Sequence, residues 1–247
     1  MHKRVFVQSI VAAVAVQVML AAPQAPAGRG GAGAAPVLKP PPLFFRESFN
    51  DDKATISARP LLTTDVTNPN LELKMYGPGA PAKPDHESGL QLYVANDAMS
   101  GGIISWVWSG MTEGNWAVTV RDKRNLVDLS GAGKIRWRIR ERGFNALHPV
   151  VKLADGTMLV GDYGEAESTF WRQNELFLID VPRWRVLIQE EVMGSTDPWR
   201  AAPDLTKVDE VGFTDLMRGT GHGKNGNTGG GNSGVDWIEV YGNAVKR

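Results

Sequence analysis

Cysteine is absent from the 247-residue sequence, and its absence removes several kinds of chemistry. Without thiols, the chain has no disulfides, no thiolate zinc sites, no cysteine nucleophile and no cysteine for lipid attachment. Asn-x-Ser/Thr acceptor sites for glycosylation are missing as well. A folded domain in this chain must therefore depend on its hydrophobic core.

An excess of charge is also absent, since Lys and Arg together total 27 and Asp and Glu together total 27. General nucleic-acid binding needs a basic surface that displaces counterions, so this balance argues against a nucleic-acid partner. The sequence has no Gly-x-Ser-x-Gly elbow, no Walker loop and no strand–helix setting for a dinucleotide site. The oligomeric state stays open.

The first residues have the layout of a secretory signal peptide. Residues 1–4 are basic, residues 5–22 are an apolar run, and Ala-Pro-Ala at 25–27 supplies small residues for cleavage. We expect the signal peptide, 1–27, to be removed and the protein to be exported by a bacterium, to the periplasm or outside the cell. An uncleaved membrane anchor is the alternative, because 18 apolar residues nearly span a bilayer.

The rest of the chain divides by composition. Residues 28–42 are rich in Pro, Ala and Gly and predict a linker. Residues 43–247 predict a single β-sandwich domain. No second apolar run is long enough to cross a membrane, so we expect no membrane span after signal cleavage.

Short alternating segments predict an all-β domain. The clearest is 135–140, where Ile135, Trp137 and Ile139 share one face of a strand and three arginines share the other. Asp155-Gly156 is typical of a tight turn between two strands. We expect further strands at 45–49, 71–75, 90–94, 116–120, 148–153, 157–161, 169–178, 185–189, 209–213 and 235–241. About ten short strands separated by turn residues indicate a sandwich or a barrel.

Three segments resemble the galactose-binding-like jelly-roll superfamily, which includes carbohydrate-binding modules and the complex I intermediate-associated protein family. Val127-Asp-Leu-Ser-Gly131 followed by 133–139 resembles an internal motif of these jelly rolls, 235–240 resembles their closing strand, and 44–49 resembles their first strand. The resemblance covers roughly residues 43–243 and implies a jelly-roll β-sandwich whose first and last strands meet.

The resemblance also implies a structural calcium ion between the first and last strands, near Glu47 and Asp236. Calcium takes six to eight oxygen ligands, and 50–52 (Asn-Asp-Asp) offers more of them. The alternative is that Asp51 and Asp52 form a solvated turn and that Asp236 faces solvent.

Tryptophan is the residue type that points most directly to a ligand, because indole rings stack on sugar rings. Trp106 and Trp108 lie two apart, so they share one face of a strand, and Trp171 and Trp184 lie near turns with polar neighbours. We therefore take these four as candidate ligand-binding residues. For each of them, packing in the core is the alternative.

Catalytic candidates are weaker. His222 lies in a glycine-rich segment, 218–234, and is a candidate ligand-binding residue and general base; an exposed linker residue is the alternative. Acidic residues between 155 and 167 invite comparison with glycosidases, but closeness in sequence does not establish their geometry. An outward stripe of arginines at 136, 138 and 140 suggests an anionic polysaccharide; pairing with acids on a neighbouring strand is the alternative.

Three functions follow as hypotheses. The first is a carbohydrate-binding protein without catalysis of its own. The second is a secreted carbohydrate-active enzyme, a hydrolase or a lyase, on the same scaffold. The third is a structural protein of the cell envelope. Because one fold hosts all three, the residues of the site must decide between them.

Overall fold

The computed structural model describes residues 40–49, 56–81, 89–143, 146–216 and 232–247, which belong to one compact unit, Leu38–Arg247. The predicted signal peptide, most of the predicted linker, residues 50–52 and His222 lie outside the described residues. No helix in the described ranges has the length and apolar character needed to cross a membrane.

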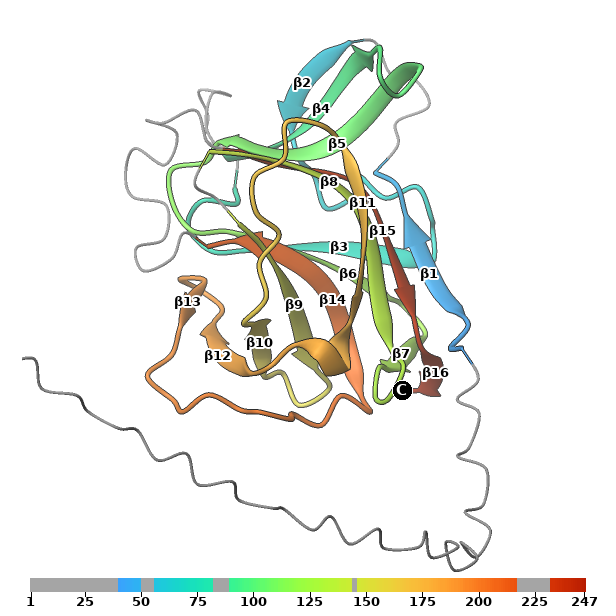
Figure 1. Ribbon diagram of the computed structural model, residues 1–247, viewed down its shortest axis with the longest axis vertical. Helices are drawn as coiled ribbons and strands as arrows, with labels where there is room; N and C mark the ends of the chain where they lie inside the picture. Colours follow the sequence, from blue (N-terminus) through green and yellow to red (C-terminus); the bar gives the residue numbers. More distant parts are fainter. Residues whose placement is uncertain (1–39, 50–55, 82–88, 144–145, 217–231) are drawn as a thin grey trace, which may run out of the picture. The chain divides into compact units, whose positions relative to one another are not determined.

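Two antiparallel sheets pack face to face and form the jelly-roll β-sandwich that the sequence predicts (Figure 1). The first sheet has the order β11-β8-β15-β5-β4-β2, and β1 also pairs with β15. Its strands are β1 (Leu43–Glu47), β2 (Ser57–Pro60), β4 (Gly89–Asp97), β5 (Gly102–Met111), β8 (Lys134–Arg142), β11 (Arg172–Phe177) and β15 (Asn232–Tyr241).

The second sheet has the order β13-β12-β10-β9-β14-β6-β3, and β7 joins it to β16 by pairing with both β14 and β16. Its strands are β3 (Leu71–Tyr76), β6 (Ala117–Asp122), β7 (Asn125–Asp128), β9 (Leu147–Leu153), β10 (Met158–Gly161), β12 (Trp184–Ile188), β13 (Met193–Gly194), β14 (Val208–Asp215) and β16 (Asn243–Lys246). Within the described ranges, the helical element is a short 3-10 turn, Leu178–Asp180.

The alternation of β8 defines the inside and the outside of the first sheet. Ile135, Trp137 and Ile139 are fully buried and belong to the main hydrophobic core between the sheets. The arginines between them are partly exposed and lie on the opposite, outer face. Burial of apolar side chains contributes on the order of 25 cal/mol for each Å² removed from water, so this inward row fixes which way the strand faces.

Strand β15 is central to the first sheet, and it brings the two ends of the domain together (Figure 1). It pairs with β8 along its whole length, while β5 and β1 occupy successive parts of its other edge. The pairing of the first strand with the last long strand is therefore as predicted. An irregularity in register between Val235 and Trp237 leaves Asp236 as an extra residue on β15.

The outer face of the second sheet carries a smaller apolar cluster that includes Val150, Met158 and Val192. Val192 is completely buried although its φ angle is 49°, a left-handed conformation that β-branched residues rarely adopt. A side chain on Gly77 would collide with Val192, since an added Cβ would lie 2.6 Å from its Cγ2. The loop before β13 is thus held against β3.

A polar network on this same outer face surrounds Glu210, which is only 3% exposed. Its carboxylate accepts hydrogen bonds from the Tyr76 hydroxyl, at 2.9 and 3.1 Å, and from the Thr119 hydroxyl. Lys152 donates to the Tyr76 hydroxyl at 3.0 Å and lies 3.7 Å from the carboxylate. Burial and the charge of Glu210 raise the pKa of Tyr76, so the phenol stays a donor. We call these four residues the Glu210 network.

Candidate functional site

Five cations alternate along the outer face of β8: Lys134, Arg136, Arg138, Arg140 and the exposed Arg142 at its end. The first three have carboxylate partners. Lys134 lies 2.8 Å from Glu175 on β11, and Arg136 lies 3.1 Å from Glu239 on β15. Arg138 forms an ion pair with Asp236 and donates to the Ser100 hydroxyl. The alternative of pairing with acids on neighbouring strands therefore holds for these three.

Arg140 differs from these three cations. Among the described residues it has neither a carboxylate within ion-pair distance nor a hydrogen-bond partner. Its guanidinium instead lies over two indoles, 5.5 Å from the ring centroid of Trp106 and 4.8 Å from that of Trp171. Arg138 also lies over Trp171, at 5.1 Å. Cation–π contacts of this kind hold a guanidinium in place without neutralising its charge.

Gly234 explains why Arg140 lacks a partner. The position opposite Arg140 on β15 is Gly234, whereas Arg136 has Glu239 opposite it on the same strand. An added Cβ at Gly234 would lie 3.2 Å from both Trp106 and Trp171. Trp106 lies on β5, the neighbour of β15, and Trp171 directly precedes β11, the neighbour of β8. Because Gly234 has no side chain, the two indoles meet edge to face over it, with their ring centroids 5.5 Å apart.

Two further aromatic rings extend the group along β4 and β5. Tyr93 lies 4.8 Å from Trp106 and 5.2 Å from Trp108, measured between ring centroids. The indole of Trp108 lies along its strand and directly over Gly110, since a Cβ added to Gly110 would come within 2.0 Å of the ring. Tyr93, Trp108 and Trp171 keep part of their surface exposed. We call this set the aromatic–arginine cluster: Tyr93, Trp106, Trp108, Arg138, Arg140 and Trp171.

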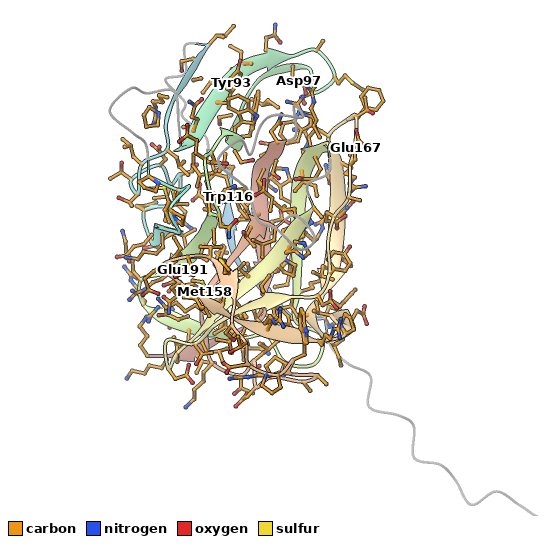
Figure 2. All side chains as sticks on the ribbon, turned by 90° about the vertical axis from the view of Figure 1, so that its left-hand side faces the viewer. Tyr93, Asp97, Trp116, Met158, Glu167 and Glu191 are labelled. Carbon is orange, nitrogen blue, oxygen red and sulfur yellow. The ribbon has the colours of Figure 1, made fainter. Side chains whose placement is uncertain are left out.

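The turn between β4 and β5 adds polar groups beside the cluster. Asp97 accepts a hydrogen bond from the Ser100 hydroxyl, which itself accepts one from Arg138. Figure 2 shows Tyr93 and Asp97 at the same end of the molecule, on β4. Burial raises the pKa of Asp236, and its ion pair with Arg138 acts in the opposite direction. Both carboxyl groups near the cluster are therefore already engaged.

The predicted tryptophans fall into two groups. The structure brings Trp106, Trp108 and Trp171 together, but Trp106 is only 5% exposed and serves mainly as packing for its neighbours. Trp184 is 1% exposed and belongs to the main core. It also lines a separate cavity of about 130 Å³ together with Leu129, Leu178 and Pro203. Its ring is therefore not available at the surface for stacking on a sugar.

Glu47 and Asp236, the predicted calcium ligands, lie on opposite faces of the first sheet. Glu47 is fully buried on the inner side, and its carboxylate accepts backbone hydrogen bonds from Phe49 and Thr67, both at 2.8 Å. Asp236 lies on the outer side with Arg138. No group of three or more potential metal ligands occurs within the described ranges. Since residues 50–52 lie outside these ranges, calcium binding stays a prediction.

The acidic residues between 155 and 167 do not gather into one site. Asp155 accepts a hydrogen bond from the backbone of Thr157 within the predicted turn, which lowers its pKa. Asp162 forms an ion pair with Arg183 at 2.7 Å. Glu165 is buried and accepts from the Tyr163 hydroxyl at 2.8 Å, while Glu167 is exposed (Figure 2). These partners account for the acids as structural residues.

One acidic cluster was not expected from the sequence. Between the sheets, the Ser233 hydroxyl lies 2.6 Å from Glu141 and 2.8 Å from Asp215, and Ser109 donates to Asp215 at 3.0 Å. A hydroxyl has one hydrogen to donate, so one of its two carboxyl contacts requires a protonated carboxyl group. Burial raises the pKa of Glu141 well above its ordinary value, so Glu141 is the carboxyl group that we expect to carry this proton.

The residues of this cluster come from β5, β8, β14 and β15, so their meeting depends on both sheets. A partial signal is present in the sequence, because Glu141 continues the inward row of Ile135, Trp137 and Ile139. An acid at an inward position predicts a hydrogen-bonded or protonated carboxyl group.

Comparisons with known proteins concern the fold. No family model and no curated protein matches the chain. Among solved structures, a family 11 carbohydrate-binding module from Clostridium thermocellum, solved with a β-1,3-1,4-mixed-linked tetrasaccharide, has a TM-score of 0.39 at 15% identity, covering 78% of this chain and 100% of that one. A proposed sugar-binding protein from Bacteroides thetaiotaomicron has a TM-score of 0.40 at 12% identity, covering 70% and 88%.

Proposed function

We propose that this chain is an exported carbohydrate-binding protein, without catalysis of its own, that holds a glycan on the aromatic–arginine cluster. The observation that carries the proposal is the set of partly exposed rings, Tyr93, Trp108 and Trp171, on one outer face beside two arginines. Aromatic faces pack against the C–H faces of sugar rings, and guanidinium groups donate to sugar hydroxyls.

The geometry of Trp108 supports this role. Its indole lies against the strand over Gly110, so one ring face is covered by the protein and the ring is oriented along β5. Tyr93 meets it nearly edge to face, at 66°. Both side chains are thus fixed before a ligand arrives, which lowers the entropic cost of binding.

The carboxyl groups beside the cluster favour binding over hydrolysis. Glycoside hydrolysis uses a pair of carboxyl groups, one of which must take up or release a proton. Asp236 forms an ion pair with Arg138, and Asp97 accepts from Ser100. The described residues offer no second, free acid beside these two, which supports the proposal of a binding role. His222 lies outside the described residues, and the catalytic hypothesis for it stays a prediction.

The proposal is tested by Trp108→Ala. We expect the unsubstituted chain to be retarded in native gels that contain a recognised polysaccharide, chosen from a panel of neutral and acidic ones. Loss of the Trp108 ring should weaken binding by about tenfold. Trp199→Ala is the matched control, because Trp199 is also partly exposed and lies between two arginines, 4.5 Å from Arg183 and 4.8 Å from Arg185, but outside the cluster.

Equal binding by Trp108→Ala and the unsubstituted chain would place the glycan elsewhere. A reducing-sugar assay on the same polysaccharides checks the second part of the proposal, and release of reducing ends would contradict it. Near-ultraviolet circular dichroism confirms that each variant is folded.

A further inference from the structure

We infer that the glycan is acidic: a carboxylate or sulfate group on it binds to the guanidinium of Arg140. This inference rests on the proposed function, since it names the ligand class of the same site. The observation behind it is the contrast along β8, where three successive cations have carboxylate partners and Arg140 has none among the described residues.

The protein positions Arg140 firmly although it leaves the charge unpaired. Trp106 and Trp171 lie on the guanidinium at 5.5 and 4.8 Å, so the side chain has little freedom to swing into bulk water. Of its three guanidinium nitrogens, only Nε is enclosed without a partner. The two terminal nitrogens therefore keep access to solvent, and they form the flat, two-donor edge that matches the oxygens of a carboxylate or sulfate group.

The surroundings of Arg140 favour an incoming anion. Burial, together with the neighbouring positive charge of Arg142, lowers the pKa of Arg140, although Asp97 acts in the opposite direction. A lowered pKa means that the protein compensates this charge less well than water does. Since Asp97 lies beyond ion-pair distance, an anionic ligand can still approach the guanidinium. An anion bound to the guanidinium supplies the negative charge that compensates Arg140.

Gly234 explains structurally why β15 provides no carboxylate to Arg140. An acid at this position would lie opposite Arg140, as Glu239 lies opposite Arg136, and would neutralise it. Instead the position lacks a side chain, and the two indoles occupy the space. The ligand thus supplies to Arg140 the negative charge that β15 supplies to Arg136 and Arg138.

Matched pairs of polysaccharides test the inference. Polygalacturonate and its fully methyl-esterified form differ in carboxylate charge, and carrageenan and its desulfated form differ in sulfate charge. We expect the unsubstituted full chain to bind at least one charged member about tenfold more tightly than its neutral counterpart, and to lose this preference as the NaCl concentration rises. The pair that shows the preference identifies the anion.

Arg140→Gln should abolish the preference, so that the charged member binds no more tightly than the neutral one. Arg140→Lys keeps the charge but loses the two-donor edge, so it should retain only part of the preference. Arg136→Gln is the matched control: it removes the same charge from the same strand and face, at a cation that already has a partner, and should leave the preference intact.

The outcomes separate the two proposals. Binding of neutral polysaccharides with no preference for charged ones overturns the inference and leaves the proposed function standing. A preference that survives Arg140→Gln also overturns it. Absence of binding to every polysaccharide overturns both proposals.

Discussion

The outer faces of the two sheets each hold a group of polar and aromatic side chains, but the groups are completed in different ways. In the Glu210 network, a buried carboxylate has a tyrosine, a threonine and a lysine around it, all supplied by the protein. In the aromatic–arginine cluster, the Arg140 guanidinium has two indoles around it and no anion among the described residues. A complete network stabilises the fold, whereas an incomplete one calls for a partner, which we propose to be a ligand.

The largest expected effect comes from breaking the complete network. Glu210→Ala leaves the partly buried Tyr76 hydroxyl and the buried Thr119 hydroxyl without their acceptor and Lys152 without its ion pair, so we expect the free energy of unfolding to fall by about 3 kcal/mol. Urea denaturation measures this loss. Glu72→Ala is the control, because Glu72 pairs with Lys74 at the surface, and it should change stability by less than about 1 kcal/mol. Similar losses of unfolding free energy in Glu210→Ala and Glu72→Ala would show that the Glu210 network does not stabilise the fold more than a surface ion pair.

An intermediate effect, dependent on pH, is expected at Glu141, where the buried group is complete only when protonated. Its folded-state pKa is raised by burial, so its contribution to stability is full below its unfolded pKa and is lost as the pH rises toward the folded value. Glu141→Gln keeps a donor to Ser233 but cannot ionise. Thermal melts should therefore show that the melting temperature of Glu141→Gln minus that of the unsubstituted chain increases from about pH 4.5 upward.

Glu175→Gln serves as the control for this pH series, because Glu175 is exposed on β11 and pairs with Lys134. Its melting profile should run parallel to that of the unsubstituted chain over the same range. Parallel profiles for Glu141→Gln would show instead that Glu141 is ionised in the folded protein.

The smallest effect on stability is expected at Gly234. A substitution there tests most directly whether the aromatic–arginine cluster serves ligand binding rather than stability. In Gly234→Ala, the new methyl group would lie 3.2 Å from both Trp106 and Trp171, so the indoles must shift by a few tenths of an ångström. We expect a stability change of about 1 kcal/mol or less together with a clear loss of glycan affinity. Calorimetry of unfolding and of binding on the same sample measures both. A change in stability without a change in affinity would separate Gly234 from the site.

The sequence predicts the architecture well because the alternation of buried and exposed residues along a strand can be seen in a short stretch of sequence. The alternation around Trp137 and the turn at Asp155-Gly156 both appear as predicted, since each depends only on neighbours in sequence. Short strands such as β2 (Ser57–Pro60) and β7 (Asn125–Asp128) are too short to show such a pattern and were not anticipated. Pairing with neighbouring strands of the same sheet stabilises them.

The site is only partly visible in the sequence, because its members meet through tertiary contacts. Parity on β5 correctly places Trp106 and Trp108 on one face. The same rule, applied to β12, would have predicted a buried Trp184 between an outward Arg183 and Arg185. That Arg140 lacks an acid, however, depends on its registry with Gly234, which lies 94 residues later in the chain and becomes its neighbour only when β8 and β15 pair.

The position of β15 also has a consequence for the order of folding events. The ion pair between Arg46 and Glu239 joins residues 193 positions apart in the sequence, and the floor of the aromatic–arginine cluster belongs to the same late strand. Until β15 arrives, β8 and β1 lack the strand that joins them, and the indoles of β5 lack the surface on which they rest. Long-range pairings of this kind are slow to form. Recovery of the proposed glycan site during refolding should therefore be among the last steps, and it reports closure of the whole sheet.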